Sequence, residues 1–180
     1  MIRIPTRNLI LILPPKTASQ SLMTALLEWD NCRGEVVVNT IHALSRDVRS
    51  TMPKTWKSAW VCGFIRNPWE WYVSAYSFAR ISGGEFFGVT TQIPFWAFVE
   101  KASATPLTWF TDAAGNILVE NIFRIEDGFE PLYAKIGETL DVPTLNVSKH
   151  GPYRDYYDRK LRKVVAEKCA REIELFGYEY

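Results

Sequence analysis

Short, unbroken aliphatic runs recur along the first half of the chain. Residues 8–13 read NLILIL, residues 35–38 read EVVV, and residues 59–65 read AWVCGFI. Runs of this length, bounded by proline, glycine or polar residues, are typical of strands covered on both faces of a parallel sheet. The sequence therefore predicts buried strands over 8–13 and 59–65 and a short strand over 35–38.

Helical patterns lie between these runs. After the first run, the segment SQSLMTALLEW repeats apolar residues at helical spacing, as at Leu22 and Leu26. A polar helix is predicted over 43–52, and Asn67-Pro68 opens another, because proline is tolerated in the first turn of a helix. Alternating strands and helices are typical of a parallel sheet with right-handed crossovers. The predicted class is α/β, with a central, mostly parallel sheet flanked by helices.

The second half carries weaker patterns. A short aromatic helix is expected over 94–102, and a hairpin over 109–119 with its turn at 112–116. A strand over 122–125 and a helix over 127–140 follow. The chain then continues as a loop over 143–153 and a C-terminal helix over 158–175. No internal repeat or low-complexity segment divides the sequence. We therefore predict a single domain over 1–180, a size that needs no metal or disulfide for stability.

Composition and charge narrow the classes of function. The 180 residues are 47% hydrophobic and 23% charged, and 21 basic against 20 acidic residues leave a net charge of +1. No general field favours nucleic acid or a membrane surface, so an anion site has to be built locally. Cys32, Cys62 and Cys169 show no metal-ligand spacing, and no metal is expected. With no signal peptide or membrane-length stretch, the expectation is a cytoplasmic protein, or a domain freed from a longer anchored form.

The loop after the first strand is the first candidate site. It reads PPKTASQS over 14–21 and joins a buried strand to a helix start, where backbone N–H groups bind anions. Lys16 supplies a cation, and Thr17, Ser19 and Ser21 supply hydroxyl groups. The loop is no Walker A motif, because it lacks glycine and its lysine precedes the helix. Taken alone, it also fits an ordinary solvated helix cap.

A second candidate lies just past the third strand, at a carboxyl edge, where ligands bind in open α/β sheets. Arg66 follows the strand directly, and Ser74 lies about two turns into the next helix. A guanidinium and a hydroxyl can bind a phosphate together. Alternatively, Arg66 pairs with Glu70 at i+4 and only tethers the helix. Together with the first loop, this segment favours one ligand that carries phosphates at both ends.

These two segments carry a resemblance to a known family. PKTASQSL and FIRNPWEWYVSAY resemble the 5'-phosphosulfate loop and the 3'-phosphate segment of the carbohydrate-type (family 2) sulfotransferases. The tail from LNVSKHGPYRDYY to FGYEY, the triplet Ile41-His42-Ala43 and TDAAGNILV are similar to short, soluble bacterial-type members. The resemblance implies a P-loop-NTPase-like sulfotransferase fold. It also implies 3'-phosphoadenosine-5'-phosphosulfate (PAPS) as donor and adenosine 3',5'-bisphosphate (PAP) as product.

The resemblance also implies roles for single residues. Lys16 contacts the bridging oxygen and the sulfuryl group, while Arg66 and Ser74 bind the 3'-phosphate. The 5'-phosphate is bound by the rest of the loop, namely Thr17, Ala18, Ser19, Gln20 and Ser21. Two departures stand out: Gln20 replaces a usual hydroxyl residue, and Ala18-Ser19 replaces a frequent Gly-Gly pair, which makes the backbone less open.

Sulfuryl transfer to a hydroxyl also needs a group that accepts its proton. The chain has two histidines, and His42 follows the second predicted strand at a carboxyl edge. With a pKa near 6.5 its imidazole is mostly neutral and can accept a proton, and the resemblance favours it as base. The alternatives are that His42 caps the helix after it, or that Glu120 or Glu126 is the base. We predict that Lys149, His150 and Tyr153 form a lid over the nucleotide, against the alternative of an ordinary surface loop.

The acceptor is the least constrained part of this prediction. A carbohydrate comes first by family association, and lipid headgroups, phenols and peptide hydroxyls stay open. The basic run 159–163 fits either an acidic-glycan contact or a solvated helix face, and Trp96, Trp109 and Phe110 fit either sugar stacking or the core. Two other functions compete: a P-loop-like kinase, which needs a Walker loop and a metal-binding acid, and a catalytically silent nucleotide- or glycan-binding module.

Overall fold

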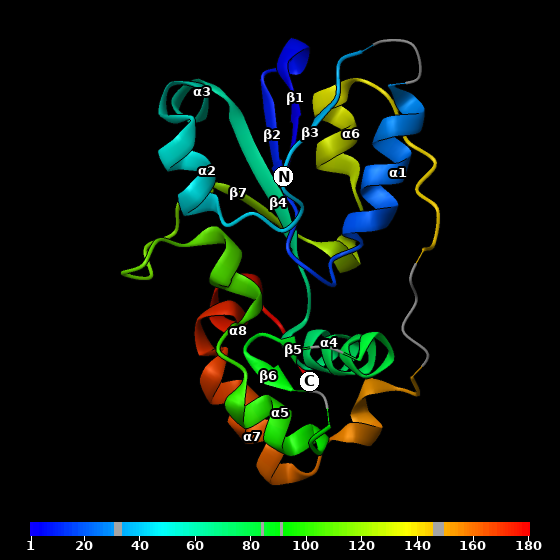
Figure 1. Ribbon diagram of the computed structural model, residues 1–180, viewed down its shortest axis with the longest axis vertical. Helices are drawn as coiled ribbons and strands as arrows, with labels where there is room; N and C mark the ends of the chain where they lie inside the picture. Colours follow the sequence, from blue (N-terminus) through cyan, green and yellow to red (C-terminus); the bar gives the residue numbers. More distant parts are fainter. Residues whose placement is uncertain (31–33, 84, 91, 146–149) are drawn as a thin grey trace. The chain divides into compact units, whose positions relative to one another are not determined.

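The computed structural model describes residues 1–30, 34–83, 85–90, 92–145 and 150–180. The chain packs into two compact units (Figure 1). The sheet unit comprises Met1–Ile65 and Thr108–Asn146, and the helical unit comprises Arg66–Leu107 and Val147–Tyr180. The single domain expected over 1–180 stays a prediction. Within the described ranges, no helix is long and apolar enough to cross a membrane.

One five-stranded sheet is described in the sheet unit. Its strands, in spatial order, are β3 (Val37–Val38), β1 (Ile2–Ile4), β2 (Leu9–Ile12), β4 (Trp60–Ile65) and β7 (Asn121–Arg124). The pairs β2–β4 and β4–β7 are parallel, whereas β1 is antiparallel to both β2 and β3. Since β2 and β3 are both antiparallel to β1, they run in the same direction as each other, and β4 and β7 share that direction. The α/β class is confirmed, and the sheet is mixed because of β1, which the sequence did not predict.

The two faces of the sheet are covered by different helices. Alternate residues of β2, including Leu9 and Leu11, join a fully apolar cluster with side chains of α1 (Ser19–Trp29) and α6 (Glu130–Ile136). The other face carries α2 (Ser45–Thr51) and α3 (Pro53–Ser58) (Figure 1). Because successive side chains of a strand point to opposite faces of the sheet, the one aliphatic run of β2 contributes side chains to both faces.

An aromatic ring packs directly onto the backbone of the central strand. Phe110, the last residue of the 3-10 helix η2 (Pro106–Phe110), is fully buried and lies over Gly63 of β4. A Cβ atom at position 63 would lie 2.4 Å from the Phe110 ring and 2.9 Å from the Ile12 carbonyl oxygen. The absence of a side chain at Gly63 therefore leaves room for the Phe110 ring on this face of the sheet.

Several predicted elements differ in extent. The strand over 35–38 shortens to β3, and the helix over 127–140 becomes η3 (Ile125–Asp127) followed by α6, which Gly137 ends in a left-handed conformation. The hairpin over 109–119 reduces to a single bridge between Thr111 and Ile117. Its turn forms where expected, because the Asp112 carboxylate accepts hydrogen bonds from the Ala114 and Asn116 N–H groups.

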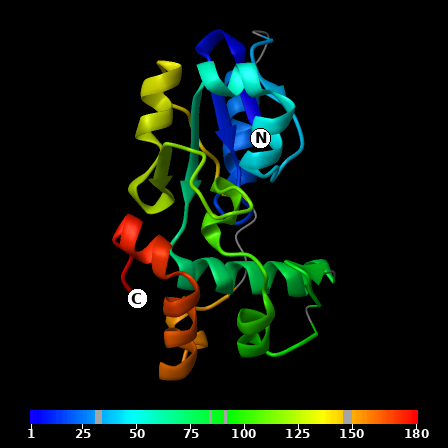
Figure 2. The ribbon, with the colours of Figure 1, turned by 90° about the vertical axis from the view of Figure 1, so that its left-hand side faces the viewer.

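The helical unit packs around α4 (Pro68–Ser82), which lies crosswise to α7 (Arg159–Lys168) in Figure 2. As predicted, α4 starts at Asn67-Pro68, and the Asn67 side chain accepts the Trp69 N–H at 3.1 Å. The other elements are the hairpin β5 (Glu85–Phe86) and β6 (Val89–Thr90), α5 (Phe95–Lys101), η4 (Tyr153–Tyr156) and α8 (Ala170–Phe176).

The C-terminal helix predicted over 158–175 is two helices, α7 and α8, that meet at Cys169. The residue before the break has a role of its own. The Lys168 ammonium donates to three carbonyl oxygens at the end of α5, those of Val99, Glu100 and Ala102, at 2.7, 3.1 and 2.9 Å. A cation at these positions satisfies carbonyls that the helix leaves unpaired and complements its dipole.

Candidate functional site

Strand direction places two predicted segments at the same edge of the sheet. Because β2 and β3 run the same way, the segments that follow them, 13–18 and 39–44, both leave the carboxyl edge. The structure shows that they touch: His42 Nδ1 lies 2.8 Å from the Leu13 carbonyl oxygen. His42 and the Lys16 loop therefore come together within the sheet unit.

The loop between β2 and α1 is tightly wound. Lys16 and Ala18 both adopt left-handed conformations, with φ of +66° and +53°, and α1 starts directly after Ala18. Thr17 and Ser19 both donate their hydroxyl protons to the Pro14 carbonyl oxygen. Left-handed residues that lead into a helix start are the backbone pattern of anion-binding nests.

The predicted hydroxyl donors have structural partners here. Thr17, Ser19 and Ser21 are all buried, and the Ser21 hydroxyl oxygen accepts the Leu145 N–H at 3.2 Å. Gln20 is exposed on the first turn of α1. Because Thr17 and Ser19 already donate their hydroxyl protons to Pro14, the contacts this loop can offer an anion are the backbone N–H groups at the start of α1, the Lys16 ammonium and the hydroxyl proton of Ser21.

The hydrogen bond of His42 fixes the state of its ring. A carbonyl oxygen only accepts, so the proton is on Nδ1, and Nε2 keeps the lone pair that a base needs. Partial burial lowers the pKa of His42 and the bond to Leu13 raises it, while the positive charges of the N-terminus and, to a smaller extent, of Lys16 lower it further. The net shift is downward, so the imidazole is neutral at pH 7.

His42 is not a helix cap. The residue at the cap position of α2 is Leu44, and no side chain of the described residues caps that helix. His42 itself has φ of +62°, an unfavourable conformation for a residue with a Cβ atom. Its carbonyl oxygen accepts the indole N–H of Trp109 at 3.0 Å. No sequence pattern predicted this contact, since the two interpretations of Trp109 were sugar stacking and core packing.

The reserve carboxylates lie at opposite ends of β7. Glu120 directly precedes the strand and is exposed, which places it at the edge away from His42. Glu126 follows the strand, in η3, and is also exposed. Neither of them shares the partly buried setting of His42.

In the helical unit, Arg66 meets both of its predicted partners at once. One nitrogen, Nη1, donates to the Ser74 hydroxyl at 3.4 Å, and the other, Nη2, pairs with the Glu70 carboxylate at 2.8 Å. The guanidinium and the hydroxyl are thus brought together, and the alternative ion pair forms as well. An incoming phosphate would meet a guanidinium that already has a carboxylate on one edge.

The predicted lid is described in part. Lys149 lies outside the described residues, and His150 Nδ1 contacts the Gly151 carbonyl oxygen at 2.7 Å. Tyr153 lies in η4, with its ring 5.7 Å from that of Tyr180 and beneath the Arg154 guanidinium. Tyr153 therefore belongs to an aromatic cluster of the helical unit, and its role as a lid stays a prediction.

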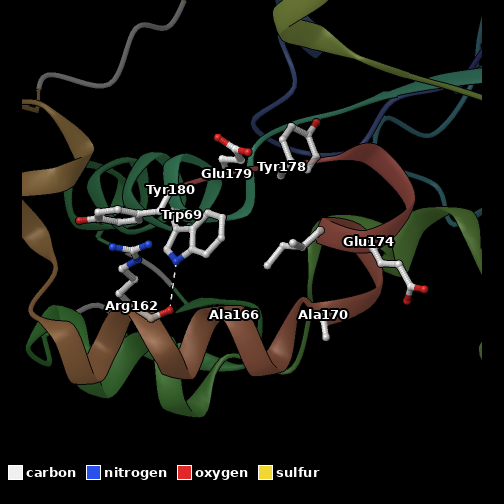
Figure 3. A pocket seen from close by; sticks show the side chains of 9 residues that line it. Trp69, Arg162, Ala166, Ala170, Glu174, Tyr178, Glu179 and Tyr180 are labelled. Carbon is white, nitrogen blue, oxygen red and sulfur yellow. Dashed lines mark hydrogen bonds between the residues drawn. The ribbon is translucent and has the colours of Figure 1, made fainter.

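A pocket of about 520 Å³ opens in the helical unit (Figure 3). Trp69 forms one wall, and its indole N–H donates to the Arg162 carbonyl oxygen at 3.1 Å. The remaining lining residues include Ala166, Ala170 and Tyr178. Arg162 comes from the basic run 159–163, and none of the residues predicted to bind the donor or to act as base lines the pocket. This pocket is a feature separate from the candidate site.

Within the described ranges, no cluster of three or more His, Cys, Asp or Glu side chains is placed to hold a metal ion. Cys62 and Cys169 are buried, and burial raises the pKa of both thiols, so neither is a reactive thiolate. Cys32 lies outside the described residues.

Comparison with solved structures found one informative match. A mouse sulfotransferase, SULT7A1, solved in complex with PAP, aligns with 92% of this chain and 84% of its own, at a TM-score of 0.51 and 10% sequence identity. At this identity the likeness establishes the fold, and the chain therefore has the fold of a sulfotransferase. No protein-family model matches the sequence, and no curated protein matches it either.

Proposed function

We propose that the protein is a PAPS-dependent sulfotransferase that transfers a sulfuryl group to an acceptor hydroxyl. The observation that carries this proposal is the hydrogen bond between His42 Nδ1 and the Leu13 carbonyl oxygen, which seats a neutral imidazole against the Lys16 loop. A base and a cation beside a helix start are the groups that such a transfer requires. The shared fold with a PAP-bound sulfotransferase supports the same assignment.

In the proposed reaction, His42 Nε2 accepts the proton of the acceptor hydroxyl as its oxygen attacks the sulfur of PAPS. The bond between sulfur and the bridging phosphate oxygen breaks in line, and adenosine 3',5'-bisphosphate (PAP) leaves. The Lys16 ammonium neutralises negative charge on the sulfuryl group and the bridging oxygen. The helix-start loop, Thr17 to Ser21, binds the 5'-phosphate through its N–H groups.

Arg66 and Ser74 bind the 3'-phosphate in this proposal, and their contact at 3.4 Å supports their pairing. Lys149 and Tyr153 cover the nucleotide. A carbohydrate is the first candidate acceptor, on the resemblance of the loop and the Arg66 segment to carbohydrate-type enzymes. The kinase alternative requires a Walker loop, which the sequence lacks.

Isothermal titration calorimetry with adenosine 3',5'-bisphosphate and with ATP, each with and without Mg²⁺, tests the donor site. We expect binding of the bisphosphate in the micromolar range, weak metal-independent ATP binding, and loss of bisphosphate binding in Lys16→Ala and Arg66→Ala. Lys57→Ala and Arg80→Ala are matched controls, because Lys57 precedes β4 at the opposite edge of the sheet and Arg80 stacks on Tyr76 at the end of α4. Mg²⁺-dependent ATP binding would favour the kinase instead.

A second measurement separates an enzyme from a silent binding module. Release of adenosine 3',5'-bisphosphate from PAPS, first in water and then with carbohydrate, lipid-headgroup, phenol and peptide-hydroxyl acceptors, reports turnover. A protein that binds the bisphosphate but releases none from PAPS under any of these conditions is a binding module, and the proposed function is then wrong.

A further inference from the structure

The backbone of His42, like those of Lys16 and Ala18, is left-handed. Its φ of +62° is one that residues with a Cβ atom rarely adopt. Such conformations persist where surrounding contacts enforce them, and they gather at functional sites.

Two hydrogen bonds fix His42 from opposite ends of the residue. The ring is bound through Nδ1 to the Leu13 carbonyl oxygen at 2.8 Å, and the main chain is bound through its carbonyl oxygen to the Trp109 indole N–H at 3.0 Å. The first bond sets the tautomer, and the second sets the peptide on which the ring is mounted. With both ends fixed, the direction of Nε2 is determined as well.

Trp109 is itself firmly anchored. Its indole is 7% exposed, and the indole N–H can only donate, so the bond to His42 satisfies a nearly buried polar group. The next residue, Phe110, is fully buried over Gly63, and its carbonyl oxygen accepts the Leu118 N–H at 2.8 Å. The packing of Phe110 on the central strand thus fixes the place of Trp109, and the hydrogen bond from Trp109 fixes the peptide of His42.

We infer that Trp109 is a positioning residue, which orients the His42 imidazole through a hydrogen bond to the His42 carbonyl oxygen. This inference rests on the proposed function for its effect on turnover, but the orientation of the ring can be measured without any acceptor. Trp109 touches neither donor nor acceptor in this role, because it acts through His42.

The decisive variant is Trp109→Phe, which keeps a buried aromatic ring and removes the N–H donor. The matched control is Trp60→Phe, which removes an indole from the opposite face of the sheet, where Trp60 packs near Phe123. Both proteins are labelled with ¹⁵N-histidine, and the ring-nitrogen shifts report tautomer and pKa. The chain has two histidines, so His150 is an internal reference.

In Trp109→Phe we expect the His42 signals to move towards a mixture of tautomers, with His150 unchanged. Turnover of PAPS, with water as acceptor, falls by roughly 10- to 100-fold, a typical cost of a misplaced catalytic group. The Kd for adenosine 3',5'-bisphosphate stays within about twofold, since the donor loop is untouched. Trp60→Phe leaves the His42 signals and the turnover as in the wild type.

Unchanged His42 signals in Trp109→Phe would overturn the inference, even if the proposed function holds. Shifted His42 signals together with full turnover in His42→Gln would support the positioning role and show that the base is misassigned. If Trp109→Phe does not fold, the isostere 3-benzothienylalanine at position 109, which replaces the N–H with sulfur at nearly constant shape, gives the same test.

Discussion

At the scale of single residues, the proposed mechanism makes turnover depend on pH through His42. Burial moves the pKa of His42 below its ordinary value near 6.5. A general base works when deprotonated, so its contribution is lost as the pH falls through that lowered pKa and is complete above it.

Turnover in the wild type should therefore keep its plateau to a lower pH than a histidine of ordinary pKa would allow, and should fall as the pH drops through the lowered pKa. His42→Gln should lower the plateau by roughly 10²- to 10⁴-fold and abolish this acidic limb, with donor affinity unchanged. The measurement is the rate of PAPS turnover between pH 5 and 8. A wild-type rate in the variant would remove His42 from the mechanism.

Glu70 gives a second prediction at this scale. Its carboxylate lies 2.8 Å from the Arg66 guanidinium, and in the proposed site it would repel the 3'-phosphate. Since both side chains are partly exposed, the effect should be modest, and Glu70→Gln should tighten bisphosphate binding by roughly two- to fivefold at low salt. Calorimetry checks it, with Glu167→Gln on α7 as control. Weaker binding would mean that Glu70 chiefly orients Arg66.

At the scale of elements, the contact between η2 and β4 determines the shape of one sheet face. A methyl group at position 63 would overlap the Phe110 ring and approach the Ile12 carbonyl oxygen. Gly63→Ala should therefore lower the free energy of unfolding by about 1–3 kcal/mol through overpacking. Urea denaturation measures this, and Gly151→Ala, whose added Cβ meets nothing closer than 3.7 Å, is the control. Equal stability of the two variants would mean that the ring moves aside.

Lys168 links two helices by a different kind of contact. Lys168→Met keeps the alkyl stem and removes three hydrogen bonds to the end of α5, so we expect a loss of about 1–2 kcal/mol in the free energy of unfolding. Lys163→Met removes a well-exposed ammonium from the same helix and should change stability by less than about 0.5 kcal/mol. Urea denaturation measures the free energy of unfolding of both variants. Equal losses in the two would contradict a capping role for Lys168.

At the scale of the whole molecule, local patterns predicted most elements, and long-range contacts explain the rest. The aliphatic runs became β2 and β4, and Asn67-Pro68 opened α4 where expected. β1 escaped prediction because Ile2–Ile4 is too short for a periodic signal and has a charged residue at its centre. The split at Cys169 escaped it because the apolar spacing continues across the break without a proline or glycine to mark it.

In the candidate site too, local patterns predicted some features, and others depend on contacts between residues far apart in the sequence. The positions of His42 and the Lys16 loop at one edge follow from strand order, which the alternation of runs suggested. The bond from Trp109 to the His42 carbonyl oxygen joins residues 67 positions apart, and no local pattern encodes it. The hydroxyls of Thr17 and Ser19 looked like ligand donors in the sequence, but the loop uses them to close on Pro14.

The order of the strands also has a consequence for how the chain folds. β4 and β7 are neighbours in the sheet, yet the whole of 66–120 lies between them. Closing so long a loop costs entropy before any contact repays it, whereas β1 and β2 are joined by only a few residues and can pair early. We therefore expect β7 to dock late. Until it does, the outer side of β4 is an open edge, so the interval before docking is when the nascent protein is most exposed to aggregation.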